Sequence, residues 1–305
     1  MAGTNTQFED FLAAEIKSGK GVSFPVKTGF VRRMLTKKAN CYSLHPNPED
    51  EFCMPEVGPN YEIISKYQQQ FLHGLKSSVP DYFGEPIIVE RLHPDGYRII
   101  NGHHRWAAAL RIGLEKIPVQ IVNLMHEADV KRILENSTHT KRVALDLDEV
   151  IFRTAEDSPY EKPLPFPWNR FYKDRIRLGV PALFHFLATK GYDIWLYSAQ
   201  YHSIDTIQNY FHKYHVKVDG IMTAIEKRRQ SSEESEKKLE NLIMKKYRYT
   251  LHIDNDSVLQ IFSETKSFRE FPLSGSPEEW SQEIMNVVEQ LENEEKSRDS
   301  HENIL

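Results

Sequence analysis

From residue 141 onwards the chain alternates short apolar runs with segments that have helical spacing. The runs that are typical of buried strands lie at 143–152, 193–199, 218–225 and 249–256. Apolar residues recur at helical intervals between them, at 181–191, 204–214 and 235–247. Strands that alternate with helices predict a parallel sheet that is covered on both faces, so we expect an α/β fold for this part of the chain.

The first part of the chain has a less regular pattern. We expect a helix at 62–75, two strands at 86–92 and 97–102 around the turn HPDG, a helix at 105–113 and a strand at 117–122. A length of 305 residues fits two domains. We therefore expect an α+β domain with an N-terminal helix over 1–126, a linker over 127–140, an α/β domain over 141–292 and a disordered tail over 293–305.

Composition places the chain among soluble globular proteins, with 40% hydrophobic and 27% charged residues. No apolar stretch approaches the roughly 18 residues of a membrane span, and the N-terminus lacks the basic start and apolar core of a signal peptide. We expect a cytoplasmic protein without a membrane partner. The two cysteines, Cys41 and Cys53, have no nearby His or Cys partners in the sequence and are expected to be buried spectator thiols.

The charges are unevenly distributed. They balance over residues 1–140, so the net charge of −5 falls on the remainder. Proteins that bind nucleic acid through its phosphates usually carry a basic surface, so this distribution disfavours such a partner. The basic run KTGFVRRMLTKK at 27–38 leaves local binding possible.

Carboxylates follow two of the expected parallel strands. Asp146 and Asp148 end the first strand, and Asp254 and Asp256 end the fourth. In an open parallel sheet, ligands bind beyond the carboxyl ends of the strands. Carboxylates gathered there repel one another unless a cation neutralises them, and oxygen ligands suit Mg²⁺. We therefore expect a magnesium site at this edge of the sheet.

These residues resemble the motifs of the haloacid dehalogenase-like (HAD) phosphatases and phosphotransferases. The first motif of that family is matched by Asp146-Leu147-Asp148-Glu149-Val150, the second by Ser198 at the end of the next strand, and the fourth by Asp254 and Asp256. The resemblance covers about residues 141–275. It implies a Rossmann-like domain that acts on a phosphorylated small molecule or nucleotide.

The resemblance also implies a role for each residue. Asp146 would attack phosphorus and form an aspartyl-phosphate, and Asp148 would protonate the leaving oxygen and then activate water. Ser198 would bind the transferring phosphoryl group. Asp146, the carbonyl of Asp148 and Asp254 would hold Mg²⁺. The lysine of the third motif is best matched by Lys238, with Lys237 and Lys227 as alternatives.

The chain has no room for a full cap domain between the first two of these strands. The segment 158–174, rich in proline and aromatic residues, is either a stiff flap over the site or a packed surface loop. Family members without caps often take large substrates or use a lid from elsewhere. This makes the N-terminal domain a candidate lid.

The sequence GHHR in the first domain stands between a strand and the start of a helix. Gly102, His103, His104 and Arg105 are there expected to form an anion site for phosphate. Two adjacent histidines point in different directions, so we do not expect zinc. Residues 40–123 resemble the ParB/sulfiredoxin-like nucleotide-binding fold, which implies ATP or another nucleotide as ligand. His103 stands where sulfiredoxins have their reactive cysteine, which argues against sulfiredoxin chemistry.

Three functions follow as hypotheses. The preferred one is Mg²⁺-dependent phosphoryl hydrolysis or transfer through Asp146, with a nucleotide or phosphate site at Gly102 to Arg105. The second is a nucleotide-dependent small-molecule kinase carried by the first domain, in which Glu49 or Glu51 is the carboxylate base. The third is a nucleic-acid-binding regulator that senses a nucleotide.

Overall fold

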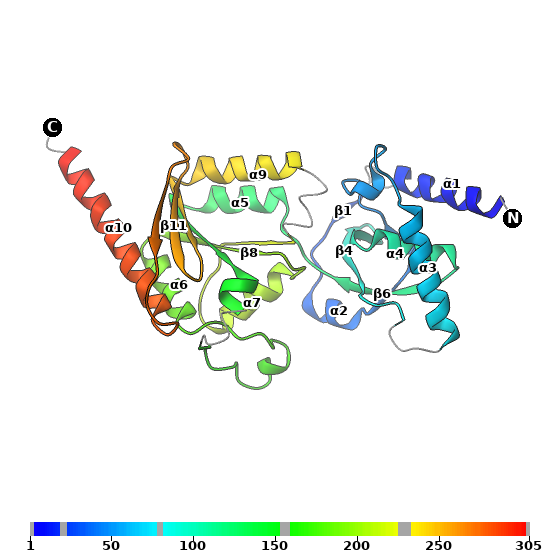
Figure 1. Ribbon diagram of the computed structural model, residues 1–305, viewed down its shortest axis with the longest axis horizontal. Helices are drawn as coiled ribbons and strands as arrows, with labels where there is room; N and C mark the ends of the chain where they lie inside the picture. Colours follow the sequence, from blue (N-terminus) through cyan, green and yellow to red (C-terminus); the bar gives the residue numbers. More distant parts are fainter. Residues whose placement is uncertain (1–2, 19–22, 78–81, 153–158, 225–232, 303–305) are drawn as a thin grey trace. The chain divides into compact units, whose positions relative to one another are not determined.

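The computed structural model describes residues 3–18, 23–77, 82–152, 159–224 and 233–302 (Figure 1). The chain divides into two compact units. Unit 1 consists of residues up to Leu124 together with Tyr201–Ser203, and unit 2 begins at Met125 and contains most of the remainder. Each unit is α/β with a mixed sheet, which confirms the expected fold class at that level.

Unit 1 is built on a six-stranded sheet in the order β2-β6-β4-β5-β3, with β1 paired to β4. The strands are β1 (Phe24–Pro25), β2 (Lys38–Asn40), β3 (Leu44–His45), β4 (Ile87–His93), β5 (Tyr97–Asn101) and β6 (Lys116–Ile121). The helices are α1 (Gly3–Ser18), α2 (Phe30–Leu35), α3 (Tyr61–Lys76) and α4 (His103–Arg111), with one-turn helices η1 (Cys41–Ser43) and η2 (Glu51–Cys53). The expected helices and strands of this part are confirmed, with ends that differ by one or two residues.

The core of unit 1 forms where α4 packs on the sheet and on α3. Trp106 of α4 is buried, and its indole N–H donates to the Cys41 carbonyl at 2.9 Å. Asn60 begins α3, because its side chain accepts from the backbone N–H groups of Glu62 and Ile63. Cys41 and Cys53 are both buried and form no disulfide, and burial raises the pKa of the Cys41 thiol to about 11. The expected burial of the two thiols is confirmed.

Unit 2 is built on a second six-stranded sheet, in the order β12-β11-β10-β7-β8-β9. Strands β7 (Lys141–Asp146), β8 (Tyr192–Ser198), β9 (Gly220–Thr223) and β10 (Tyr249–Ile253) are parallel. Strands β11 (Ser257–Phe262) and β12 (Phe268–Pro272) extend the sheet as an antiparallel hairpin. The parallel part confirms the expected alternation, whereas the sequence patterns did not predict the hairpin.

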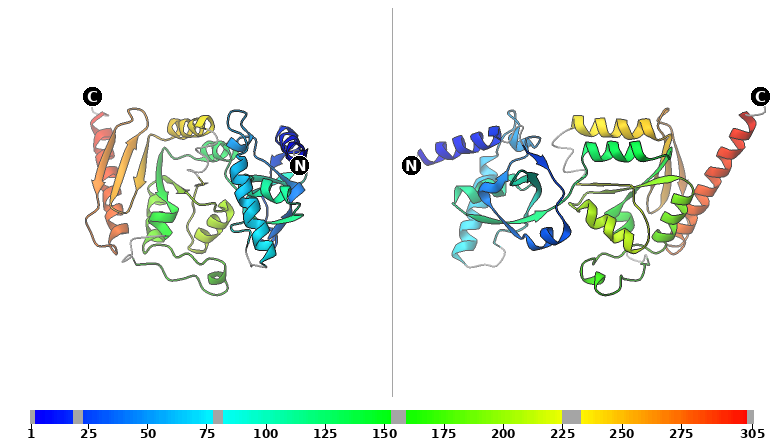
Figure 2. Two further views of the ribbon diagram at one scale, coloured as in Figure 1. Left: turned by 45° about the vertical axis from the view of Figure 1, so that its right-hand side comes forward. Right: turned by 180° about the vertical axis from the view of Figure 1, so that it is seen from behind.

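Five described helices accompany this sheet: α5 (Glu127–Asn136), α6 (Val180–Thr189), α7 (Ile204–Lys213), α9 (Glu233–Lys246) and α10 (Trp280–Glu302). Helices α5 and α9 lie side by side over one face of the sheet (Figures 1 and 2). Helix α6 begins after Gly179, which has a positive φ of 84°. A Cβ at this position would also overlap the Ser281 side chain, so both the backbone conformation and the packing require glycine.

Two expected boundaries in unit 2 are wrong. The segment 127–140 is not a linker, because α5 inserts Val130 and Leu134 into the core of this unit. The C-terminal helix does not end at residue 292 but continues to Glu302. Acidic residues of that segment pair with cations of the sheet, as in the contacts of Glu295 with Lys141 and of Glu294 with Arg269. In the described ranges, none of the helices has both the length and the apolar character that crossing a membrane requires.

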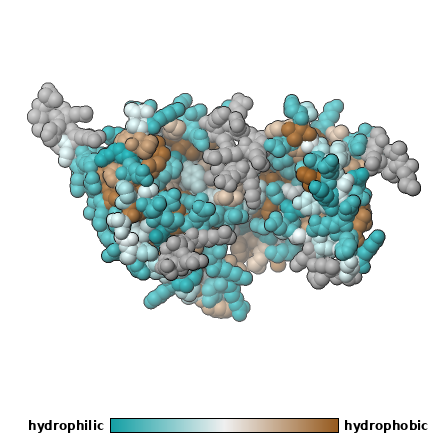
Figure 3. Space-filling view, in the orientation of Figure 1, coloured by the Kyte–Doolittle hydropathy of each residue, from teal (hydrophilic) through white to brown (hydrophobic). Residues whose placement is uncertain are grey.

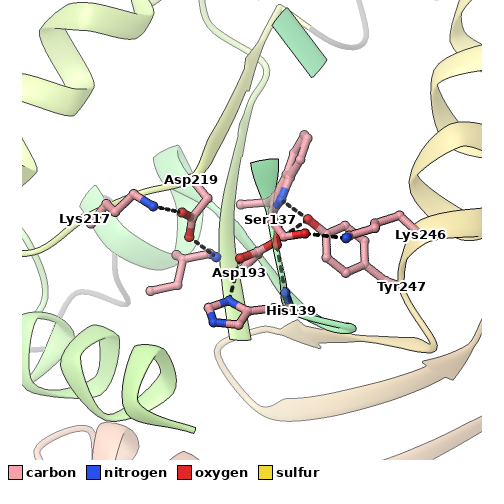
Figure 4. Close-up of polar contacts among 9 residues, drawn as sticks. Ser137, His139, Asp193, Lys217, Asp219, Lys246 and Tyr247 are labelled. Carbon is pink, nitrogen blue, oxygen red and sulfur yellow. Dashed lines mark hydrogen bonds and ion pairs between the residues drawn. The ribbon is translucent and has the colours of Figure 1, made fainter. Parts of the chain in front are cut away.

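A buried polar cluster fixes the amino ends of the central strands (Figure 4). Asp193 at the start of β8 is 3% exposed and accepts three hydrogen bonds or ion-pair contacts. Its partners are the Ser137 hydroxyl at 2.5 Å, the Tyr247 hydroxyl at 2.6 Å and the His139 Nδ1 at 2.8 Å. Because Ser137 and His139 precede β7 and Tyr247 precedes β10, one carboxylate joins the starts of three strands. The cluster therefore holds β7, β8 and β10 in register at their amino ends, opposite the carboxyl ends where Asp146 and Asp254 lie.

Candidate functional site

The parallel register of β10, β7 and β8 brings the expected site residues to one edge of the sheet. Asp146 ends β7 opposite Tyr197, so Ser198 lies one residue beyond it on β8. Leu145 lies opposite Ile253, so Asp254 follows β10 at the level of Asp146. The structure therefore places the three motif positions on three neighbouring strands at their carboxyl ends, as the sequence predicted.

The Asp146 side chain is held by the turn that follows it. Residues Leu147–Phe152 form a short π-helical turn, η3, and the Glu149 backbone N–H donates to Asp146 Oδ1 at 2.6 Å. Burial raises the pKa of the Asp146 carboxyl, and the charges of Asp148 and Glu149 raise it further, against hydrogen bonds from backbone N–H groups that lower it. Ionised Asp146 therefore lies in a field of negative charge that a nearby cation would relieve.

Asp148 and Ser198 are joined directly. The Ser198 hydroxyl, which is 1% exposed, donates to Asp148 Oδ2 at 2.6 Å. The same oxygen of Ser198 accepts the backbone N–H of Gln200 at 2.9 Å, which orients the hydroxyl toward Asp148. This bond joins the carboxyl ends of β7 and β8 and fixes the Asp148 carboxylate at the edge where Asp146 lies.

The loop after β10 is fastened to the turn after β7. Asp254 Oδ1 accepts the Asn255 N–H at 2.7 Å, and its carbonyl accepts the Trp280 indole at 3.0 Å. The Asn255 side chain donates to the Glu149 carbonyl at 3.4 Å and accepts from Arg177 Nη1 at 2.8 Å. Arg177 is buried above the Trp280 ring, 4.0 Å from its centroid. Neither Arg177 nor Asn255 was among the residues expected from the sequence.

The donors at this edge fit Mg²⁺ in their chemistry. The expected set uses only two carboxylates, Asp146 and Asp254, with the Asp148 carbonyl, and leaves the remaining positions to water and phosphate oxygens. In the part of the chain that the structure describes, no group of three or more His, Cys, Asp or Glu side chains is arranged to hold a metal ion. A metal bound by this edge would therefore depend on oxygens from the substrate or from water as well as on the protein.

The lysine expected for the third motif is placed on α9. Lys238 is exposed, and its charge acts on Glu127 of α5, whose pKa is lowered mainly by Lys131 and less by Lys238. Lys227 lies outside the described residues, as does the side chain of Lys237. The catalytic role of Lys238 stays a prediction.

In unit 1 the two histidines of GHHR organise the loop in front of them. His103 is 3% exposed, and its Nε2 accepts the Asn47 N–H at 3.1 Å. His104 Nε2 accepts the Asn60 N–H at 3.1 Å. Burial lowers the pKa of both imidazoles, that of His103 to about 3. Both rings therefore act as neutral acceptors at neutral pH, and His103 brings no positive charge to an anion.

Arg105 and Gly102 complete the start of α4. The Arg105 guanidinium is 7% exposed and donates to the Glu85 carbonyl and, at 3.0 Å, to Asn101 Oδ1. Gly102 has a φ of 103°, and a Cβ there would lie 3.1 Å from Arg105 Nη2. The backbone conformation favours glycine, and a side chain would also crowd the guanidinium. Arg105 thus holds the strand ends around the helix start.

The carboxylate that faces these histidines is Asp50. Its Oδ1 accepts the Phe52 N–H at 3.0 Å and lies 3.4 Å from His103 Nδ1, while Glu49 and Glu51 are exposed. Burial raises the pKa of Asp50, against the Phe52 N–H and the charge of His104, which lower it. A carboxylate base in this unit would therefore be Asp50 rather than either glutamate.

Acidification is expected to destabilise unit 1 through His103. Below its unfolded pKa of 6.5 the unfolded chain takes up a proton that the folded state excludes down to about pH 3. The free energy of unfolding should therefore fall by about 2 kcal/mol between pH 7 and pH 5 from this group alone. Chemical denaturation at pH 7 and pH 5 measures this fall in the free energy of unfolding. Between the same two pH values, His103→Asn should lose less stability than the parent protein. Should the His103 ring signals in NMR spectra titrate near pH 6.5, the prediction is wrong.

One comparison with known proteins bears on this unit. A family model, the ParB N-terminal domain, matches residues 58–138, a range that contains α3, β4, β5, GHHR with α4, and β6. The N-terminal part of the chain is similar to the ParB N-terminal domain. This match confirms the ParB-like resemblance; it extends over α5 of unit 2 and ends before Asp146. No match to a curated protein was found.

Proposed function

We propose that unit 2 is a HAD-type, Mg²⁺-dependent phosphatase or phosphotransferase that forms an aspartyl-phosphate on Asp146. The observation that carries the proposal is the hydrogen bond from Ser198 to Asp148 beside Asp146 at the carboxyl ends of neighbouring parallel strands. The strand order β10-β7-β8-β9 with Asp254 after β10 supports the same assignment. A rotated or slipped strand would have separated these positions.

Each residue has a chemical task in this proposal. The Asp146 carboxylate attacks phosphorus and forms an aspartyl-phosphate, so that one difficult displacement becomes two easier ones. Protonated Asp148 gives its proton to the leaving oxygen. Ser198 donates to Asp148 in the resting site, and in the reaction it would donate to the phosphoryl group. Mg²⁺, held by Asp146, the Asp148 carbonyl and Asp254, would offset the charge of phosphate and carboxylates.

Phosphate release should depend on Mg²⁺ and on the Ser198 hydroxyl. We expect chelation by EDTA to lower release from a panel of phosphomonoesters and nucleotides by about 100-fold or more, and added Mg²⁺ to restore it. Ser198→Ala should lower kcat about tenfold or more, because a hydrogen bond in the transition state is lost. Ser267→Ala, in the turn between β11 and β12, is the matched control and should keep full activity. Activity that is unchanged by EDTA would contradict the proposal.

We also propose that the ParB-like part binds ATP or another nucleotide near Gly102 to Arg105. The family match across this segment supports the proposal. The nucleotides in the same panel test whether this unit is itself catalytic. Nucleotide consumption that requires Arg105 and survives Asp146→Asn would favour the kinase hypothesis over the phosphatase.

A further inference from the structure

The segment 159–178 of unit 2, here called the flap, exposes three aromatic side chains within six residues. Phe166 is 70% exposed, Trp168 38% and Phe171 45%. Figures 1 and 2 show the flap as a loop that projects from the body of unit 2 below α7. In Figure 3 it forms a mostly hydrophilic lobe at the lower edge, with apolar atoms at its end. Exposed aromatic side chains gathered in this way mark a binding surface.

The flap holds these aromatic side chains in place. Its base is closed by a bridge between Tyr160 and Arg177, and Leu164 is buried in the core of unit 2. The Tyr210 hydroxyl of α7 donates to the Asp174 carbonyl at 2.6 Å. The Trp168 residue begins the one-turn helix η4 (Trp168–Arg170) and is preceded by three prolines, at 163, 165 and 167. A segment fixed in this way loses little conformational entropy when it binds a ligand.

Cations surround the exposed rings. The flap carries four exposed basic residues, Lys162, Arg170, Lys173 and Arg175. Of its acids, Asp174 is exposed, whereas Glu161 accepts the Gly179 N–H at 2.9 Å. In addition, Lys213 of α7 lies 3.8 Å from the centroid of the Trp168 ring. This excess of positive charge stands in a part of the chain that is acidic as a whole, so the flap is complementary to a polyanion.

The base of the flap is connected to the candidate catalytic residues. Arg177 donates to the Asn255 side chain, which in turn donates to the carbonyl of Glu149, three residues after Asp146. The Arg177 N–H also donates to the Ile151 carbonyl at 2.9 Å. The flap therefore leaves the fold beside the loops that carry Asp146 and Asp254.

We propose that the flap binds single-stranded nucleic acid and that the phosphate removed by unit 2 is the terminal phosphomonoester of such a strand. The inference rests on the proposed phosphatase function. In the reaction the bond between phosphorus and the terminal oxygen of the strand breaks, and Asp148 protonates that oxygen. Water then cleaves the aspartyl-phosphate, so that the products are a strand with a hydroxyl end and inorganic phosphate.

Exposed rings interleaved with cations favour single-stranded nucleic acid over a duplex or an acidic peptide. Every base offers a flat face that stacks on an aromatic side chain, and each stack contributes about 1–3 kcal/mol. In a duplex these faces are covered by neighbouring bases, and an acidic peptide has no such faces. The phosphates of the strand would lie beside Lys173, Arg170 and their neighbours, which makes binding sensitive to salt.

Binding is tested on full-length Asp146→Asn, which keeps the flap and cannot turn the ligand over. Trp168 is the exposed one of the four tryptophans, the others being at most 2% exposed, so its fluorescence reports on stacking. We expect a 12-nucleotide oligothymidylate to quench this fluorescence. The fluorescence anisotropy of a labelled oligothymidylate, which does not depend on Trp168, should show about tenfold weaker binding after Trp168→Ala. Phe268→Ala, which removes a ring that is 64% exposed on β12, is the matched control and should bind normally. Equal binding of dextran sulfate, a duplex or polyglutamate would overturn the proposal.

Turnover separates the inference from the function on which it rests. With Asp146 intact, Trp168→Ala should lower kcat/KM about tenfold for a 5′- or 3′-phosphorylated oligonucleotide and leave p-nitrophenyl phosphate within twofold. Hydrolysis of p-nitrophenyl phosphate without any preference for the oligonucleotide would overturn the inference and leave the phosphatase standing. Oligonucleotide binding without hydrolysis of any phosphomonoester would overturn the assigned reaction.

Discussion

Asp146→Asn is expected to remove Mg²⁺-dependent phosphate release almost completely, by on the order of 1,000-fold or more. The amide nitrogen and oxygen are poor nucleophiles, and the first step of the proposed reaction requires the carboxylate. The substitution also removes one of the two charged groups expected to bind Mg²⁺. Phosphate release from the best phosphomonoester of the panel, measured at saturating Mg²⁺, checks this prediction.

The same variant should be at least as stable as the parent protein when no Mg²⁺ is present. The folded state raises the pKa of Asp146, so the protonated carboxyl favours the folded state at low pH, and this contribution to stability is lost as the pH rises from the unfolded pKa through the folded one. Asparagine does not ionise, so the folded variant does not carry the cost of a buried negative charge. It also keeps an oxygen that accepts the Glu149 N–H. Thermal unfolding at pH 7 measures the effect. Glu270→Gln, which removes one negative charge at an exposed position of β12, is the control for the change in net charge. If Asp146→Asn is inactive because it is unfolded, the activity of Ser198→Ala tests the mechanism instead.

The parallel strands of unit 2 were predictable because both of their faces are buried. Continuous apolar runs such as that of β8, in which six of seven residues are buried, are distinctive in a sequence. The hairpin was not predictable from such runs. In β12 no residue is buried, and half-buried positions such as Arg269 and Phe271 alternate with exposed ones. The segments 127–140 and 293–302 were misassigned because their helices depend on tertiary contacts, which a local pattern does not contain.

The site was predictable to the same extent as the strands. Asp146 and Ser198 end parallel strands and Asp254 follows one directly, so strand order was sufficient to bring them to one edge. Arg177 reaches Asn255 over 78 positions of sequence, through a loop whose conformation no periodicity determines. The charge of His103 was likewise misjudged, because the expected phosphate site assumed an accessible imidazole and burial makes the ring neutral.

Asp193→Ala is expected to have the largest effect on stability. Asp193 is buried at the start of β8 and accepts from Ser137, Tyr247 and His139, which lie in the segments that lead into β7 and β10. Alanine would leave the Tyr247 hydroxyl without this acceptor in the interior, would remove the contacts of the part-buried Ser137 and His139, and would separate the three strand starts. The cost should be about 3 kcal/mol or more in the free energy of unfolding, measured by chemical denaturation followed through the tryptophans of unit 2.

A matched substitution separates this effect from the removal of any aspartate near the same strand. Asp219 accepts the Ile194 N–H at 2.9 Å and pairs with Lys217, whose side chain is 85% exposed. Because solvent screens this pair, Asp219→Ala should cost about 1 kcal/mol. Equal losses for the two variants would show that the contacts of Asp193 do not fix the strand starts. If they do, Asp193→Ala should also lower phosphate release, since the register that places Asp146 beside Ser198 is set at that opposite edge of the sheet.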